Sequence, residues 1–128
     1  MNLKEYFENV KGVGVLATAD ADGKVNVAVY ARPHFLDSED EKTATFIMNE
    51  RLSYANIQAN PKAAYLFIEE VEGYVGKRLS LAKIREEDDA EKIKSIRRRD
   101  LPDDCDEGKK RYLVHFHIEG VRPLIGTE

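Results

Sequence analysis

The sequence predicts a mainly β fold of the α+β class: a small antiparallel barrel, closed or partly closed, that carries three helices. Short runs of β-branched or alternating residues, separated by turn residues, recur along the chain. Helix and strand patterns follow in the order αβββαββαβ, which favours hairpin-linked antiparallel strands over a doubly wound parallel sheet. The 128 residues, 42% of them hydrophobic, are enough for a core, so we expect a single domain over residues 1–128.

The first quarter of the chain predicts a helix followed by a β-hairpin. In residues 2–10 the apolar side chains recur with the i, i+3, i+4, i+7 spacing of an amphipathic helix. Residues 13–19 and 24–32 are strand-like runs, and the Asp- and Gly-containing segment between them is suited to a turn. The second run alternates between two faces. We expect one face to point into the core, namely Val25, Val27, Val29 and Ala31. The opposite face would then meet a ligand, a partner subunit or water, and it carries Asn26, Ala28, Tyr30 and Arg32.

The middle of the chain predicts a strand, a helix and a second strand. Residues 43–48 form the first strand, and Asn49 is a suitable N-cap for a helix over 50–59. Pro61 marks the end of that helix. Residues 63–68 are so apolar that we place their strand near the centre of the sheet.

The last part of the chain predicts a strand, a charged helix and a final strand. Residues 77–84 alternate, as do residues 111–118. Between them, residues 86–100 begin with acidic and end with basic side chains, the order that complements a helix dipole. An acidic loop over 101–108 follows.

Composition excludes several classes of function. The formal net charge of −4 argues against a dedicated nucleic-acid-binding protein. No apolar run approaches the length of a membrane span, and the first residues lack the apolar region of a signal peptide, so we expect a cytoplasmic protein without a membrane segment. The single cysteine, Cys105, excludes an internal disulfide, and its acidic neighbours disfavour the thiolate that a catalytic cysteine needs.

The start of the predicted 50–59 helix is suited to bind an anion. Arg51 and Ser53 lie in its first turn, where backbone N–H groups lack helical partners and the helix dipole favours negative charge. Arg32, at the end of the hairpin, could reach the same anion. The alternative is that Arg51 is solvated and that Ser53 bonds a nearby carbonyl.

Several segments together resemble the pyridoxamine 5′-phosphate oxidase-like, FMN-binding split-barrel family. The resemblance follows the element order from about residue 2 to residue 123, and its motifs are concentrated in residues 12–68. The matching segments are Gly14-Val15-Leu16-Ala17-Thr18, Ala31-Arg32-Pro33, Thr45-Phe46-Ile47-Met48-Asn49, Arg51-Leu52-Ser53-Tyr54-Ala55-Asn56-Ile57 and Asn60-Pro61-Lys62-Ala63-Ala64.

The resemblance implies a split barrel that binds FMN non-covalently at the interface of a homodimer and acts as an oxidoreductase. It assigns the FMN phosphate to Arg32, Arg51 and Ser53. It places the flavin ring against Ala28, Val29, Tyr30, Met48 and Asn49. A small-molecule substrate or electron donor would complete the reaction, with no side chain required as a covalent catalyst.

Two departures from the family matter. Many relatives carry a lysine where this chain has Ser53, so the phosphate site has one positive charge fewer unless Arg51 substitutes. The true oxidases also use a C-terminal segment with tryptophan and arginine near the substrate, whereas this chain has no tryptophan, which argues against oxidation of pyridoxamine 5′-phosphate itself. A flavin carrier or electron-transfer module therefore stays open as an alternative, as does a haem-handling protein on the same barrel.

The haem alternative would involve His115 or His117, which lie two apart on the last predicted strand and so share a face. A metal ion would need a third ligand, for instance His34 or Glu119. We expect no metal site and two partly exposed histidines.

Overall fold

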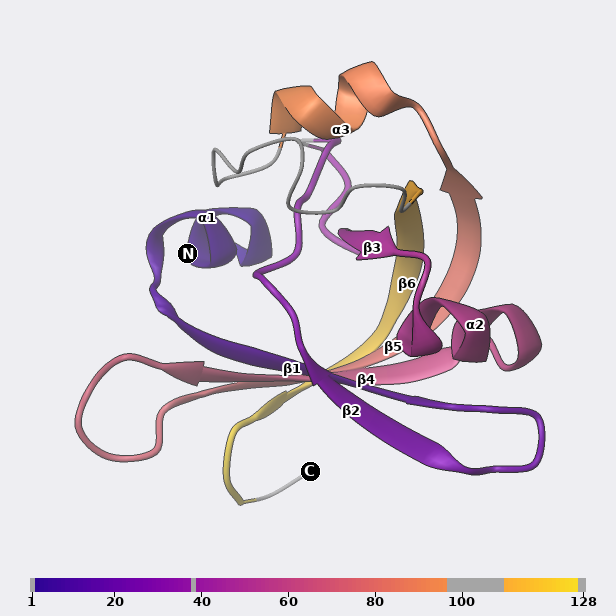
Figure 1. The fold of residues 1–128 in the computed structure, drawn as a ribbon. Helices are drawn as coiled ribbons and strands as arrows, with labels where there is room; N and C mark the ends of the chain where they lie inside the picture. Colours follow the sequence, from indigo (N-terminus) through magenta and orange to yellow (C-terminus); the bar gives the residue numbers. More distant parts are fainter. Residues whose placement is uncertain (1, 38, 97–109, 127–128) are drawn as a thin grey trace.

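The computed structural model describes residues 2–37, 39–96 and 110–126, and it has the predicted element order (Figure 1). The elements are α1 (Leu3–Asn9), β1 (Gly12–Ala19), β2 (Val25–Val29), β3 (Thr43–Asn49), α2 (Leu52–Ala59), β4 (Lys62–Glu69), β5 (Gly76–Glu87), α3 (Ala90–Ile96) and β6 (Arg111–Pro123). Among the described residues, no helix is long and apolar enough to cross a membrane.

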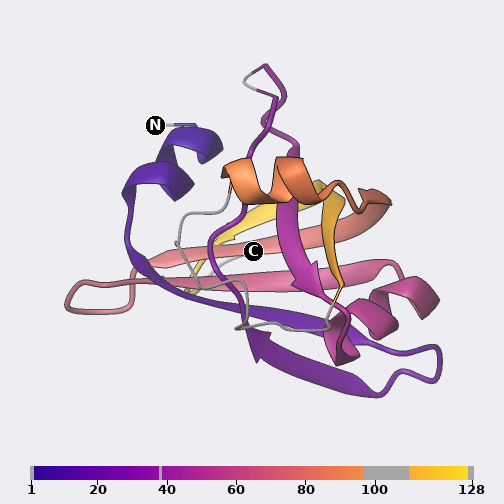
Figure 2. The ribbon, with the colours of Figure 1, turned by 45° about the horizontal axis from the view of Figure 1, so that its top comes forward.

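All six strands form one antiparallel sheet in the order β2-β1-β4-β5-β6-β3. The sheet curls, so that its two outer strands, β2 and β3, come to the same side of the molecule (Figures 1 and 2). The β5–β6 ladder shifts register twice, and such irregularities increase strand bending. After β2 the chain crosses to β3, where His34 and Thr45 exchange two backbone hydrogen bonds of 2.8 Å. The result is a split barrel with three helices, which confirms the predicted fold class.

An aromatic core fills the barrel. Phe46 packs on Tyr65 with ring centroids 5.0 Å apart, and Phe7 of α1 packs on Phe67 at 5.3 Å. Asn2 caps α1 by accepting a hydrogen bond from the Glu5 N–H, and the buried side chains of Tyr6 and Phe7 hold the helix over one end of the core (Figure 1).

Several predicted boundaries are wrong, and the last two strands run on to Glu87 and Pro123. Asn49 is the last residue of β3, paired with Arg111, so the β3–β6 ladder prevents it from capping α2; Arg51 occupies the N-cap position instead. The second strand ends at Val29, before the crossing segment. The charged helix begins at Ala90, because Glu86 and Glu87 remain paired with β6. The rest of that predicted helix (97–100) and the acidic loop (101–108), including Cys105, lie outside the described residues.

The predicted inward valine face of β2 is also wrong. Val25, Val27 and Val29 are 77%, 66% and 76% exposed. The alternation is correct but the faces are reversed, because the side of β2 that carries Asn26 packs toward α2, where the Asn26 amide donates to Ser53 Oγ at 3.4 Å. The valines continue into neighbouring strands across the outer surface of the sheet. We call this surface the valine face, and its members are Val25, Val27, Val29, Val15, Ala17, Ala19, Ala64, Leu66 and Ile68.

Candidate functional site: a cavity at the split of the barrel

A cavity of about 370 Å³ lies where the barrel is split, between β2, the end of β3 and the start of α2. Its lining consists of Asn26, Val27, Ala28, Val29, Tyr30, Ala31, Ile47, Asn49, Arg51, Leu52 and Ser53. The lining is mixed, with apolar side chains along the strands and polar ones near the helix. Such a cavity is suited to an amphipathic small molecule with one charged end.

The backbone of β2 borders the cavity through its outer edge. Backbone groups in an antiparallel strand point alternately to the two sides, and Tyr30 directs its N–H to Gly14 of β1, at 2.9 Å. Val27 and Val29 alternate with the residues that bond to β1. They therefore point their N–H and C=O groups away from β1.

The same alternation applies to β3, which forms the opposite wall. Thr45 bonds to His34 rather than to β6, so Ile47 and Asn49, in phase with Thr45, direct their backbone groups away from β6. Both of these residues line the cavity, whereas their neighbour Met48 does not. The cavity thus lies between two strand edges that offer backbone donors and acceptors.

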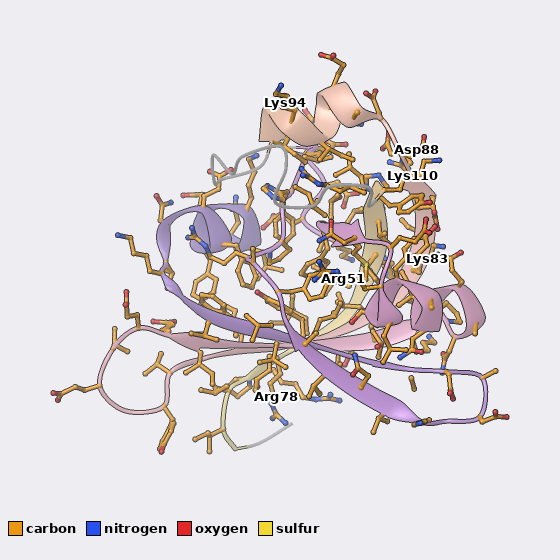
Figure 3. All side chains as sticks on the ribbon, viewed as in Figure 1. Arg51, Arg78, Lys83, Asp88, Lys94 and Lys110 are labelled. Atoms are coloured by element: carbon orange, nitrogen blue, oxygen red, sulfur yellow. The ribbon has the colours of Figure 1, made fainter. Side chains whose placement is uncertain are left out.

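The start of α2 forms the polar end of the cavity. The first N–H groups of a helix have no acceptor within it, and the helix dipole makes this end partly positive. Arg51 lies beside the start of α2 (Figure 3), and the buried Ser53 is 4% exposed. These groups create a site that favours an anion.

Tyr30 adds a phenol to this polar end. Burial raises the pKa of Tyr30, and this outweighs the hydrogen bond with Ser53 and the positive charge of Arg51, both of which lower it. Tyr30 is therefore a neutral hydroxyl at physiological pH. Its ring packs edge-on against Phe46, and its backbone oxygen accepts a hydrogen bond from Tyr65, so its position is fixed.

Six of the eight residues predicted to bind the cofactor line this cavity: Ala28, Val29, Tyr30, Asn49, Arg51 and Ser53. The other two do not. The Arg32 guanidinium donates to the backbone oxygen of Val10 at 2.9 Å, at the end of α1. Met48 is fully buried in the core, on the face of β3 that points into the barrel.

Sequence reasoning missed Leu52 beside the helix start, and it turned Val27 and Ala31 toward the core although both line the cavity. Asn26 belongs to the face that was expected to meet a ligand, a partner subunit or water. On β3 the phase of the strand separates the lining residue Ile47 from its buried neighbours Phe46 and Met48. Using that signal requires knowing that β3 is an outer strand of the sheet.

The two histidines of β6 lie in different environments. His115 is 2% exposed, so the prediction of partial exposure is wrong for this residue, whereas His117 is exposed. Both ring nitrogens of His115 are engaged: Nδ1 lies 2.7 Å from Thr45 Oγ1, and Nε2 lies 2.7 Å from Glu87 Oε2. Within the described ranges, no group of three or more His, Cys, Asp or Glu side chains is arranged to hold a metal ion.

His115 is expected to make stability depend on pH. Burial lowers the pKa of His115, opposed by the hydrogen bond with Glu87 and assisted by the charges of Arg85 and Lys92. A histidine with a lowered pKa in the folded state stabilises the fold above its unfolded pKa, about 6.5, and this contribution is lost as pH falls through the folded value.

We expect the unfolding free energy, from urea titrations between about pH 7.5 and 5.5, to fall toward acid. His115→Gln would flatten that slope and His117→Gln would not; equal slopes in all three proteins would contradict the prediction.

Comparison with known proteins identifies the family. The model of the family described as pyridoxamine 5′-phosphate oxidase matches residues 3–123, nearly the whole chain. The chain belongs to the pyridoxamine 5′-phosphate oxidase family. No curated protein matches the sequence.

Solved structures similar to this member of the pyridoxamine 5′-phosphate oxidase family share its fold at low sequence identity. An FMN-binding protein from Syntrophomonas wolfei has a TM-score of 0.74 at 18% identity, covering 99% of this chain and 86% of that one. An F420 reductase has a TM-score of 0.67 at 19% identity, covering 92% and 94%. An FAD-binding protein from Mesorhizobium loti has a TM-score of 0.57 at 16% identity, covering 94% and 90%. Identities this low establish the fold alone.

Proposed function

We propose that the chain is a single FMN-binding domain and acts as an oxidoreductase that passes electrons through a non-covalent flavin. One observation carries the proposal: the cavity joins an anion-binding helix start to a slot between two strand edges. FMN has the matching parts, a terminal phosphate and a flat ring with a hydrogen-bonding edge. FMN, F420 and FAD appear in the names of structural neighbours, which supports a flavin-type cofactor.

The start of α2 would bind the phosphate. Arg51 supplies a positive charge, Ser53 a hydroxyl, and the first turn of the helix its backbone N–H groups. Ser53 Oγ is within reach of the Asn26 amide, at 3.4 Å, so Asn26 adds a further donor at this end.

The two strand edges would hold the ring. Its polar rim can bond the backbone groups of Val27 and Val29 on one side and, on the other, those of Ile47 and the N–H of Asn49, whose carbonyl accepts from the Arg51 N–H. Ala28 leaves room for a flat ring near the strand. The bound cofactor would supply the electron-transfer chemistry, while these residues orient it and limit water access.

A second copy of the chain would cover the valine face. The exposed valines of β2 form a contiguous apolar surface with β1 and β4, and such surfaces mark interaction sites. Val27 and Val29 belong both to this face and to the cavity lining. A partner seated there would therefore border the cofactor, which supports a homodimer with FMN at the subunit interface.

The test is an absorbance spectrum of the purified protein before and after addition of FMN, followed by assays with nicotinamide electron donors. We expect a saturable flavin spectrum and turnover with a reduced donor. Bound flavin without turnover would contradict the oxidoreductase and favour the carrier, and a protein that ignores FMN would contradict both. A Soret band in the purified protein would instead support haem.

A further inference from the structure

A polar cluster ties the outer side of α2 to strand β5. The hydroxyl of Tyr54 and the amide of Gln58 both donate to the Glu86 carboxylate, the latter at 2.7 Å. The Lys83 ammonium pairs with the same carboxylate and lies beside α2 (Figure 3). Glu86 thus accepts from three side chains, two of them on the helix.

A second tie joins Glu50, which precedes the N-cap of α2, to strand β6. The Tyr112 hydroxyl donates to the Glu50 carboxylate at 2.9 Å. The rings of Tyr112 and Tyr54 stack with centroids 4.2 Å apart and planes 10° from parallel. We call the two ties together the α2 clamp, and its members are Glu50, Tyr54, Gln58, Lys83, Glu86 and Tyr112.

The charge states in the α2 clamp allow its hydrogen bonds to form at neutral pH. Burial raises the pKa of Glu86, but the hydrogen bonds from Lys83, Tyr54 and Gln58 together outweigh burial. The pKa of Glu86 is therefore lowered and the carboxylate is ionised. Burial and the hydrogen bond to Glu86 raise the pKa of Tyr54, so its hydroxyl keeps the proton that it donates.

The start of α2 depends on such external contacts. An eight-residue helix is too short to be stable by itself, and the N-cap Arg51 makes no side-chain capping bond. Glu50 and Tyr54 flank Arg51 and Ser53 in sequence, and their side chains bond to β6 and β5 respectively. The clamp therefore holds both ends of the segment that carries the anion-binding groups.

We infer that the α2 clamp positions the start of α2 for the phosphate of the cofactor, with Tyr54 and Tyr112 as positioning residues. This inference rests on the proposed function, because it assigns the anion at this site to FMN. Neither tyrosine lines the cavity, so both act through the backbone of residues 51–53.

The test compares affinities for FMN and for riboflavin, which has the same ring and no phosphate. Tyr54→Phe keeps the ring stack and removes the hydrogen bond to Glu86. We expect it to reduce the FMN-to-riboflavin affinity ratio about fivefold, the usual scale for one hydrogen bond, and to leave riboflavin affinity unchanged. The ³¹P resonance of bound FMN would shift as well, which a loss of overall stability alone would not cause.

Tyr6→Phe is the matched control. Tyr6 also donates to a carboxylate, Glu69 at 2.6 Å, but on α1, away from the cavity. It is expected to leave both the affinity ratio and the ³¹P resonance unchanged.

The outcomes separate the inference from the proposed function. An unchanged ratio in Tyr54→Phe, or an equal loss of affinity for both ligands, would overturn the clamp's role while FMN binding stands. A wild-type protein that binds neither ligand would overturn the proposed function itself. Should Tyr54→Phe fail to fold, Tyr112→Phe, which removes the bond to Glu50 and keeps the ring stack, carries the same comparison.

Discussion

Arg51→Ala is expected to weaken FMN binding by about 1.5–3 kcal/mol, the scale of a charge-assisted hydrogen bond. Arg51 is the cation at the start of α2 and lines the cavity, and removing it leaves the uncharged side chains of Ser53, Asn26 and Tyr30 and backbone N–H groups for the phosphate. Because the lost interaction involves the phosphate, riboflavin affinity is expected to change little. A fluorescence titration with both ligands measures this.

Arg85→Ala is the control for Arg51→Ala. Arg85 is exposed on β5, and its ion pair with Glu87 at 3.5 Å is of the kind that contributes little. It is expected to bind FMN like the wild type. Unchanged FMN affinity in a folded Arg51→Ala protein would remove Arg51 from the site.

Val25→Asp is expected to convert the proposed homodimer into a monomer. Val25 is 77% exposed on the valine face and does not line the cavity, so the substitution leaves the cofactor-binding residues in place. In a two-fold dimer the new carboxylate enters the interface twice, and burial of an uncompensated charge costs several kcal/mol. We expect the dimer dissociation constant to rise by about two orders of magnitude or more. Sedimentation equilibrium measures this change. The molar mass is expected to fall from twice the chain mass of 14.6 kDa to that mass.

The control for Val25→Asp is Val71→Asp. Val71 is 56% exposed in the connection between β4 and β5, at the opposite end of the sheet from the β1–β2 turn (Figure 1). This variant is expected to remain dimeric. A wild-type protein that is monomeric under the same conditions, or a dimeric Val25→Asp, would contradict the assignment of the valine face to a second copy.

The order of helices and strands could be predicted from the sequence because each element has a local pattern. The spacing of Tyr6 and Phe7, both buried in α1, is an example, and the alternation along β2 is another. The start of α2 could be located within two residues for the same reason, and with it the position of Arg51 and Ser53.

The faces of the outer strands could not be predicted, since they depend on which strand lies beside which. β2 borders the split of the barrel, so its polar side packs toward α2 and its valines point outward. The family resemblance places Met48 against the ring, but the phase of β3 puts it in the core and Ile47 at the cavity. Arg32 likewise bonds to the end of α1, a contact between distant parts of the sequence.

The most direct test of the central claim is a calorimetric titration of the wild-type chain with FMN. The single cavity described between β2, β3 and α2 predicts one FMN bound per chain, and we expect a dissociation constant of about 1 µM or below. Riboflavin is expected to bind more weakly, because the start of α2 would then meet no phosphate. Saturable binding with that stoichiometry and preference would support the cavity at the split of the barrel as the cofactor site. No saturable binding of FMN, or equal affinity for riboflavin, would contradict it.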